Sequence, residues 1–338
     1  MYERILTDFN IRTIMDSGQV FRIRPLSPEE PAPPAASDSV RSGLSGSALP
    51  AAADGSFSAD GTFLAAAGGH AVLIRQEAEP TGRMRVSFSC TEQEFKDFWN
   101  DYFDLNRDYG AIRRSVDPDD AFLTSAVRFG YGIRILRQDL WETIISFLIS
   151  QNNNITRIRR SLEALCGRFG EKIPAERISD PLFSGENGSK EKPSETAGRA
   201  NRLPPTASLY AFPTPEAILE GGPDGLEGLG LGYRDKYILR MTQRCAGHEG
   251  RQWLASLQKS SYADAAALLQ KEYGIGKKVS DCICLFALHH VDAFPIDTHM
   301  KQILAAFYPD GFPFSRYEGY AGILQQYMFY YKLTGQPV

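Results

Sequence analysis

The sequence predicts an α+β protein in which a small antiparallel sheet precedes a larger helical part. Four segments of the first ninety residues are rich in β-branched or aromatic residues and lie between turn signals, as short antiparallel strands do. From about Pro118 onward, apolar residues recur at helical spacing instead. A length of 338 residues, 43% of them hydrophobic, is enough for two domains with a core each. The four predicted strands are Gln19–Ile23, Thr62–Ala66, His70–Gln76 and Arg83–Cys90.

We assign residues 1–117 to the sheet domain. Thr91 with Glu94 three residues later is a capping box, and it opens an amphipathic helix through Phe95 and Trp99. Residues 25–61 are rich in Pro, Ser, Ala and Gly and contain almost no large apolar residue. Such a segment buries too little surface to offset its ordering entropy, so we predict a flexible insertion there.

Residues 118–338 form the second predicted domain, an all-α bundle. Leu140–Ile149 is apolar nearly all round, as a buried helix would be, and Thr156–Phe169 is amphipathic with a basic face. Residues 184–206 are a second polar insertion, which we interpret as a surface linker. Further helices are predicted near Pro215–Glu220, Asp235–Ala246, Tyr262–Glu272, Val279–His290, Thr298–Phe307 and Arg316–Lys332.

The charge of the chain is unevenly distributed. A net charge of −4 and a pI near 5.8 argue, for the whole chain, against a nucleic-acid or membrane partner. However, residues 1–120 carry 12 basic and 19 acidic side chains, whereas residues 121–338 carry 25 and 22. The acidity therefore belongs to the first third, and a nucleic-acid function of the helical part stays open.

The chain has features of an intracellular protein. No run approaches the roughly 18 apolar residues of a membrane span, and the first ten residues are too charged for a signal peptide. The five cysteines form no CxxC pair, which favours a reducing compartment and no metal site. We expect cytoplasm or nucleoid in a bacterium, or the nucleus in a eukaryote.

The most informative segment is a helix, a tight turn and a second helix between residues 265 and 290. Gly274 and Gly276 permit positive φ and close backbone approach, so the turn can aim amide groups at an anion such as a DNA phosphate. Lys277 and Lys278 stand at the start of the second helix, where the macrodipole disfavours an ammonium ion. A desolvated lysine there is a potential nucleophile, and a surface lysine that touches phosphate is the alternative.

Asp297 and the two nearby cysteines each have an ordinary structural explanation. Asp297 before Thr298 suits a helix N-cap, with Pro295 fixing the entry of the chain. Capping is compatible with catalysis, because a capping carboxylate is held rigidly. Cys282 and Cys284 suit packing in the core.

Several motifs outside the turn give the chain a family resemblance. It resembles the 8-oxoguanine DNA glycosylase/AP lyases of the helix-hairpin-helix Gly/Pro/Asp superfamily. The resemblance implies a TBP-like antiparallel domain followed by a helix-hairpin-helix domain, and a bifunctional base-excision-repair enzyme that removes 8-oxoguanine opposite cytosine. The motifs are GQVFR at 18–22, LRQD at 136–139, FLISQNNNITR at 147–157, LGLGYRDKY at 229–237, VSDCICL at 279–285 and YAG at 320–322.

The resemblance implies roles for the lysine and the aspartate. Lys278, directly before Val-x-Asp-Cys, matches the catalytic position, which leaves Lys277 as a neighbour. Asp297 matches the catalytic aspartate. A carboxylate stabilises the positive charge that develops on the sugar, and an amine that attacks C1′ gives a Schiff base that can undergo β-elimination.

The resemblance also implies a pocket for a flipped base. Gly18 would offer its carbonyl to N7–H of 8-oxoguanine, and Cys282 would cover one face of the base. Phe329 would stack on the base and Gln325 would read its Watson–Crick edge, and their i, i+4 spacing puts them on one helix face. His299 would lie near a flanking phosphate, as would the glycines of the turn.

Four further residues match positions that fill the vacated space and read the orphaned base. Asn152 would fill the gap and Tyr233 would wedge beside the orphaned base. Arg157 and Arg234 would donate to N3 and O2 of cytosine, which are acceptors, so both together predict a preference for cytosine.

The resemblance implies duplex DNA as the partner of a monomer without cofactor, because no four-cysteine cluster follows the helical domain. One alternative is a superfamily relative that acts on alkylated or mismatched bases. Another is a noncatalytic DNA-binding module, which would bind DNA in a salt-sensitive way without strand scission. The joint presence of Lys278, Asp297, Gln325 and Phe329 favours catalysis.

Overall fold

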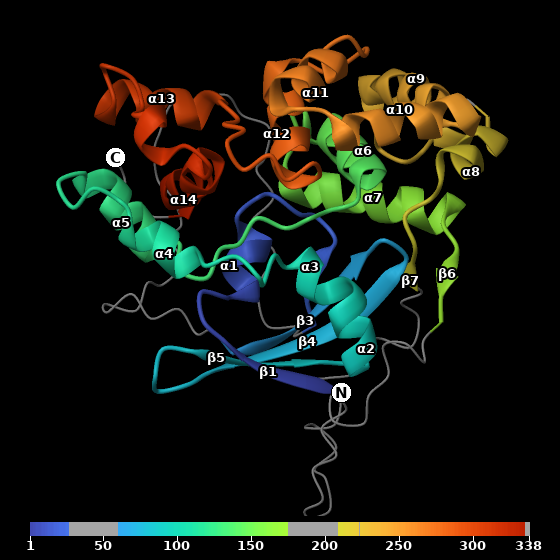
Figure 1. The fold of residues 1–338 in the computed structure, drawn as a ribbon. Helices are drawn as coiled ribbons and strands as arrows, with labels where there is room; N and C mark the ends of the chain where they lie inside the picture. Colours follow the sequence, from blue (N-terminus) through green and yellow to red (C-terminus); the bar gives the residue numbers. More distant parts are fainter. Residues whose placement is uncertain (27–59, 175–208, 223, 335–338) are drawn as a thin grey trace, which may run out of the picture.

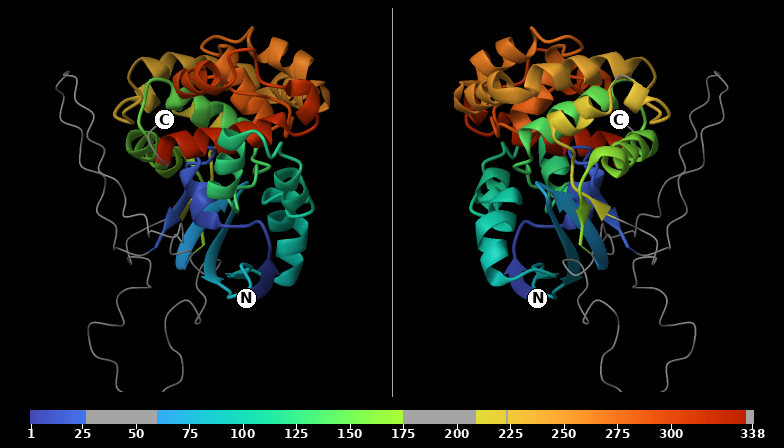
Figure 2. Two further views of the ribbon diagram at one scale, coloured as in Figure 1. Left: turned by 90° about the vertical axis from the view of Figure 1, so that its left-hand side faces the viewer. Right: turned by 90° about the vertical axis from the view of Figure 1, so that its right-hand side faces the viewer.

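The computed structural model describes residues 1–26, 60–174, 209–222 and 224–334. A five-stranded sheet forms one end of the molecule and a body of helices the other, with α1 (Ile11–Asp16) between them (Figure 1). The two side views show the same layering (Figure 2). The predicted α+β class is therefore confirmed. The insertions predicted at 25–61 and 184–206 lie almost entirely or entirely outside the described residues.

The sheet is antiparallel throughout, with strand order β1-β5-β4-β3-β2. Three predicted strands are confirmed, whereas the one predicted at Gln19–Ile23 is wrong for most of its length, because the chain is extended in the sheet only from Ile23. The sequence pattern did not indicate β1, an edge strand with three exposed residues in its middle. The strands are β1 Tyr2–Leu6, β2 Ile23–Pro25, β3 Gly61–Ala67, β4 His70–Ala78 and β5 Met84–Phe88.

The predicted cap at Thr91 is present, but only half of the box forms. The Thr91 hydroxyl accepts the amide of Glu94 at 3.1 Å. The Glu94 carboxylate instead contacts His70 Nδ1 at 3.2 Å and Trp99 Nε1 at 3.4 Å, which ties the helix to β4. The helical segments of this part are α2 Glu92–Glu94, the π-helix η1 Phe95–Trp99, α3 Asn100–Tyr102 and α4 Tyr109–Arg114.

The second part is helical, with one small exception to the all-α prediction. Two short strands, β6 and β7, pair on either side of residues 175–208. They pack over the outward face of β3 and β4 through Ile173 and Leu209. The elements are α5 Ala121–Phe129, α6 Leu140–Ser150, α7 Ile155–Phe169, β6 Lys172–Ile173, β7 Leu209–Tyr210, α8 Pro215–Glu220, η5 Asp224–Leu226, η6 Gly232–Arg234, α9 Asp235–Cys245, α10 Gly247–Lys259, α11 Tyr262–Leu269, α12 Lys277–Phe286, α13 Thr298–Phe307, η7 Phe314–Tyr317 and α14 Ala321–Thr334.

Helix boundaries differ from prediction, most clearly at three places. The helix predicted to end at Ala246 is followed directly by α10, which was not predicted, across a break at Gly247 with φ +69°. α12 ends at Phe286 rather than at the predicted His290, and His289 adopts the left-handed region at φ +56°. The segment predicted to be helical from Arg316 begins with a 3-10 turn, and α14 starts only at Ala321.

Apolar packing crosses the predicted boundary at residue 117 in both directions. Phe21 and Ile112 belong to the core of the helical body, whereas Leu136 belongs to the core beneath the sheet. The buried Arg134 guanidinium donates to the carbonyls of Asp8 and Asp104, both at 2.7 Å. The division into residues 1–117 and 118–338 stays a prediction.

Three general features of the described residues bear on function. None of their helices has the length and apolar character that a bilayer crossing requires. All five cysteines are buried and free. No group of three or more His, Cys, Asp or Glu side chains in the described ranges could hold a metal ion.

Candidate active site

The two lysines at the start of α12 have different surroundings. Lys277 is exposed, and its Nζ lies 3.1 Å from Oδ2 of the buried Asp281 one turn later. The other oxygen of Asp281 accepts the hydroxyl of Tyr262 at 2.8 Å. Lys278 is half-buried, and its Nζ lies 5.4 Å from the centre of the Phe147 ring. Lys278 lines a cavity behind the turn, and Lys277 does not.

The two glycines of the turn serve different purposes. Gly274 has φ +91°, and a Cβ there would lie 2.7 Å from the Tyr237 ring. Gly276 has φ −92° and open space around it, so of the two glycines that permit positive φ only Gly274 adopts it. Gly276 is the N-cap of α12, and no side chain caps that helix. The first amides of α12 are therefore accessible to an anion.

The cavity brings together every residue predicted for catalysis and base recognition. These residues come from a turn after α1, from α12, from the start of α13 and from α14. The first and the last of them, Gly18 and Phe329, are more than 300 positions apart in the chain. Its lining includes Gly18, Lys278, Cys282, Asp297, Gln325 and Phe329.

Asp297 is held in place by the helix that it caps. Its Oδ1 accepts the amide of Met300 at 2.9 Å, which confirms the predicted cap of α13. The partial positive charge at a helix start stabilises negative charge there. Asp297 can therefore cap α13 and still line the cavity, and its carboxylate is held in the wall of the cavity that Lys278 also lines.

Cys282 forms a neutral wall of the cavity. Burial raises the pKa of its thiol, while the charge of Lys278 opposes that rise. The side chain lies one turn after Lys278 on α12 and is only 3% exposed. Cys284 belongs to the core, as expected.

Two of the remaining cavity residues contribute polar groups, which are the backbone of Gly18 and the side-chain amide of Gln325. Gly18 has φ +79°, and a Cβ there would lie 3.4 Å from the Phe329 ring, so the backbone closely approaches that ring. Gln325 is buried and donates from Nε2 to the carbonyl of Pro295 at 3.1 Å. Its Oε1 is buried without a hydrogen-bond partner. The exposed His299 ring lies 6.2 Å from that of Phe329.

Three of the four residues predicted to fill the gap or contact the opposite base lie together at the loop between α6 and α7. Asn152 has φ +48° and donates to the Tyr233 hydroxyl at 3.3 Å. The Arg234 guanidinium stacks over Tyr233 at 4.6 Å and donates to the carbonyls of Gln151 and Asn152. Arg157 is exposed on the first turn of α7. Arg234 thus supports this loop, and its predicted contact with a base stays a prediction.

Sequence reasoning missed five residues of the cavity wall. Phe147 begins one of the family motifs, Phe286 follows another and Pro295 precedes Asp297, but none of the three was assigned to the cavity. Ser17 and Gln326 also line the cavity. The available signal was Gln326, a second amide beside Gln325 at a buried position of α14.

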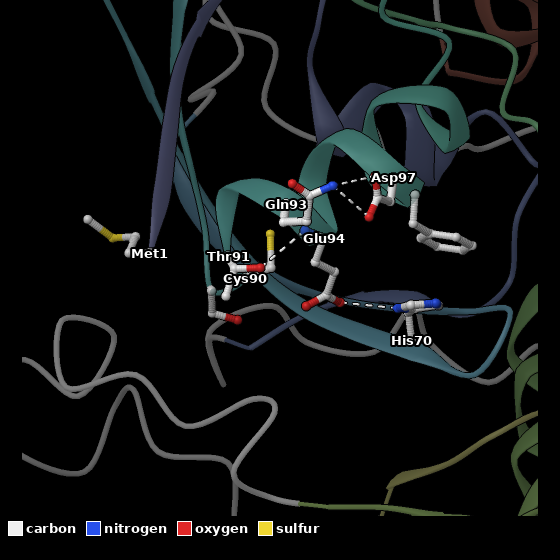
Figure 3. Close-up of a pocket in the computed structure, with 9 residues that line it drawn as sticks. Met1, His70, Cys90, Thr91, Gln93, Glu94 and Asp97 are labelled. Atoms are coloured by element: carbon white, nitrogen blue, oxygen red, sulfur yellow. Dashed lines mark hydrogen bonds and ion pairs between the residues drawn. The ribbon is translucent and has the colours of Figure 1, made fainter.

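A second hollow lies on the sheet part and contains none of these residues. In it His70 points toward Glu94, and Gln93 points toward Asp97, with Nε2 2.8 Å from Oδ1 (Figure 3). Burial raises the pKa of Cys90, which also lines it, to about 12, so its thiol is not a reactive nucleophile at neutral pH. These polar groups satisfy one another, and the cavity beside Lys278 is the stronger candidate.

The chain is similar to several known proteins in sequence. The model of the 8-oxoguanine DNA glycosylase N-terminal domain matches residues 3–144. An N-glycosylase/DNA lyase of Saccharomyces cerevisiae is 33% identical over 181 residues, which cover 51% of this chain and 41% of the yeast protein. The N-glycosylase/DNA lyase OGG1 of Arabidopsis thaliana is 28% identical over 220 residues, covering 64% and 48%. The chain spans about half the length of these curated relatives.

Solved structures match over nearly the whole chain. The 8-oxoguanine glycosylase/lyase of Clostridium acetobutylicum, solved with double-stranded DNA containing cytosine opposite 8-oxoG, has a TM-score of 0.69 and 26% identity, covering 98% of this chain and 97% of that one. MBOgg1 in complex with a low-affinity DNA ligand has a TM-score of 0.71 and 27% identity, covering 98% and 99%. A 3-methyladenine DNA-glycosylase from Archaeoglobus fulgidus, 19% identical with a TM-score of 0.61, shares the fold.

Proposed function

We propose that this chain, which is similar to 8-oxoguanine DNA glycosylases in residues 3–144 and in its fold, removes 8-oxoguanine from duplex DNA and then cleaves the strand. The observation that supports this proposal is the meeting of an amine, a carboxylate and the polar groups of Gly18 and Gln325 in one cavity. An enzyme acting on a base within a duplex has to extrude it into such a pocket.

In the proposed reaction, Lys278 is the nucleophile. Its amine bonds to C1′ as the bond from C1′ to N9 breaks, and the base leaves with a proton. Asp297 stabilises the positive charge on the sugar. The amine loses its proton, the sugar ring opens to a Schiff base, and removal of a C2′ proton expels the 3′-phosphate.

Gly18 and Gln325 supply the proposed selectivity for the base. 8-Oxoguanine carries a proton on N7 where guanine carries a lone pair, so a carbonyl facing N7 binds the lesion and repels guanine. The Gln325 Oε1, which is buried without a partner, is available to a donor on the Watson–Crick edge. Phe329 supplies a face for stacking, and Cys282 covers the other side.

On the opposite strand we propose that Asn152 fills the gap, Tyr233 wedges beside the orphaned base, and Arg157 and Arg234 read cytosine. Gly274, Gly276, Lys277 and His299 would approach phosphates. We expect the chain to act as a monomer without a cofactor, in the compartment that holds the chromosome.

Borohydride trapping on a duplex with 8-oxoguanine opposite cytosine tests the nucleophile. The wild-type chain should form a covalent complex, and Lys278→Gln should lose it. Lys277→Gln is the matched control and should retain trapping, because Asp281 holds Lys277 outside the cavity. Full trapping by Lys278→Gln would refute Lys278 as the nucleophile.

Single-turnover excision opposite each of the four bases tests the reading of cytosine. Arg157→Ala should reduce excision opposite cytosine by about tenfold or more and narrow its advantage over the other bases, because each base-edge contact contributes roughly 1–3 kcal/mol. Arg160→Ala, an exposed arginine on the same helix, is the control and should keep the wild-type order. An unchanged cytosine preference in Arg157→Ala would contradict this role.

A further inference from the structure

We propose that three glutamines, Gln19, Gln138 and Gln326, form a clamp that fixes the Gly18 peptide and thereby sets the discrimination between 8-oxoguanine and guanine. This inference rests on the proposed function. The three residues are positioning residues, since they act on the base through the backbone of Gly18. They come from the turn after α1, from the segment before α6 and from α14.

The Gln19 side chain anchors the segment from within. It is fully buried, and its Nε2 donates to the Ser17 hydroxyl at 2.8 Å and to the carbonyl of Arg134 at 2.9 Å. Its Oε1 accepts the amide of Leu136 at 2.9 Å. An amide side chain has two donor hydrogens and an acceptor oxygen, and all of them are used here. Gln19 therefore has a single orientation relative to the helical body.

The other two glutamines hold the carbonyls on either side of Gly18. Gln326 Nε2 donates to the carbonyl of Ser17, and Gln138 Nε2 donates to the carbonyl of Gln19 at 2.8 Å. In the part of the chain that the structure describes, no donor bonds to the Gly18 carbonyl. Of three successive carbonyls, the middle one is thus left for a ligand at a residue that lines the cavity.

Holding this peptide matters because the two bases differ so little. A site built around one hydrogen bond rejects an analogue that lacks the donor only if the acceptor stays in place. Glycine at positive φ has broad conformational freedom, so an unclamped Gly18 peptide could turn its carbonyl away. The clamp gives the glutamines of the GQVFR and LRQD motifs a shared structural role, because Gln138 donates to the carbonyl of Gln19.

The test compares two reactions of the same site. One is excision of 8-oxoguanine, which requires recognition of the base, and the other is strand cleavage at an abasic site, which does not. Gln326→Met and Gln138→Met each remove one donor at similar side-chain length. Single-turnover excision of 8-oxoguanine opposite cytosine should fall about tenfold, the effect of losing one hydrogen bond. In Gln138→Met, whose side chain does not line the cavity, strand cleavage at a preformed abasic site should stay within about twofold, because that reaction uses Lys278 but reads no base.

The control is Gln76→Met, which removes a buried glutamine of β4 that bonds to Asn10 and Ile11. It should lower the melting temperature and leave the ratio of the two activities unchanged. Gln138 is half-buried, so its variant carries the test even if Gln326→Met does not fold.

The clamp proposal would be overturned if Gln138→Met kept the wild-type ratio of base excision to abasic-site cleavage, whether both activities were unchanged or both fell equally. Absence of 8-oxoguanine excision by the wild-type chain would instead overturn the proposed function. The two failures are therefore distinguishable.

Discussion

At the scale of single residues, chemically identical side chains differ by what holds them. Lys277 and Lys278 are neighbours in the chain, yet the exposed Lys277 bonds to the buried Asp281, whereas Lys278 faces Phe147 in the cavity. The same holds for Gln325 and Gln326, which lie side by side in α14. One keeps a free oxygen in the cavity, and the other is engaged with the Ser17 carbonyl. Identical side chains at neighbouring positions are therefore given different roles in our proposals because they have different contacts.

A buried carboxylate gives a prediction about pH. Burial raises the pKa of Glu142 from its usual 4.5 to about 7, although Arg22 lies 4.0 Å away and opposes the rise. Above pH 4.5 the unfolded chain ionises this group first, so stability falls until the pH passes about 7. Glu142→Gln removes that loss, which amounts to at most about 3 kcal/mol.

Thermal melts of both proteins at pH 5 and pH 8 check this. The melting temperature of the variant, relative to that of the wild type, should rise between the two values. A difference that stays constant with pH would contradict the shifted pKa.

At the scale of elements, the turn before α12 contains one glycine that the packing requires and one that we propose to lie near a phosphate. A Cβ at Gly274 would lie 2.7 Å from the Tyr237 ring on a backbone with φ +91°, whereas a Cβ at Gly276 meets nothing within 4 Å. Gly274→Ala should therefore destabilise the protein by about 1–3 kcal/mol. Urea unfolding measures this loss.

Gly276→Ala is the matched variant. It should cost less than about 1 kcal/mol in stability, but it should weaken DNA binding, because a methyl group would obstruct the proposed approach of a phosphate to the amides of α12. Fluorescence anisotropy with a labelled duplex provides the readout. Equal losses of stability in Gly274→Ala and Gly276→Ala would contradict the assignment of different roles to the two glycines.

At the scale of the whole molecule, the buried Asp104 joins distant segments. Its oxygens accept Arg107 at 3.0 Å, Tyr109 at 3.0 Å and Arg137 at 3.1 Å, and His289 lies 3.4 Å away. Burial alone would raise the pKa of Asp104, but His289 and the two arginines outweigh it and hold the pKa below its usual range. Its stabilising effect is present at neutral pH and is lost as the pH falls through that lowered pKa.

Asp104→Asn should thus destabilise the protein at pH 7 by about 3 kcal/mol, because it leaves charged partners uncompensated. The gap between variant and wild type in urea unfolding should narrow as the pH falls toward 3. A gap of the same size at both pH values would contradict the assignment.

Much of the fold follows from patterns within a few residues of one another. The cap at Thr91, the cap at Asp297 and the apolar run of α6 are local, and they were predicted. β1 and α10 were not. β1 is an edge strand whose central residues face solvent, and α10 begins at a glycine directly after another helix.

The sequence by itself determined the α+β class, the turn at Gly274 and, through family motifs, the two residues proposed for catalysis. Only the tertiary structure decided which groups meet in the cavity, and that Gln138 and Gln326 hold the peptides beside Gly18. The reason is physical. Caps and periodicity act over one or two turns and are visible in the sequence, whereas these contacts join segments more than a hundred residues apart and exist only once the chain has closed.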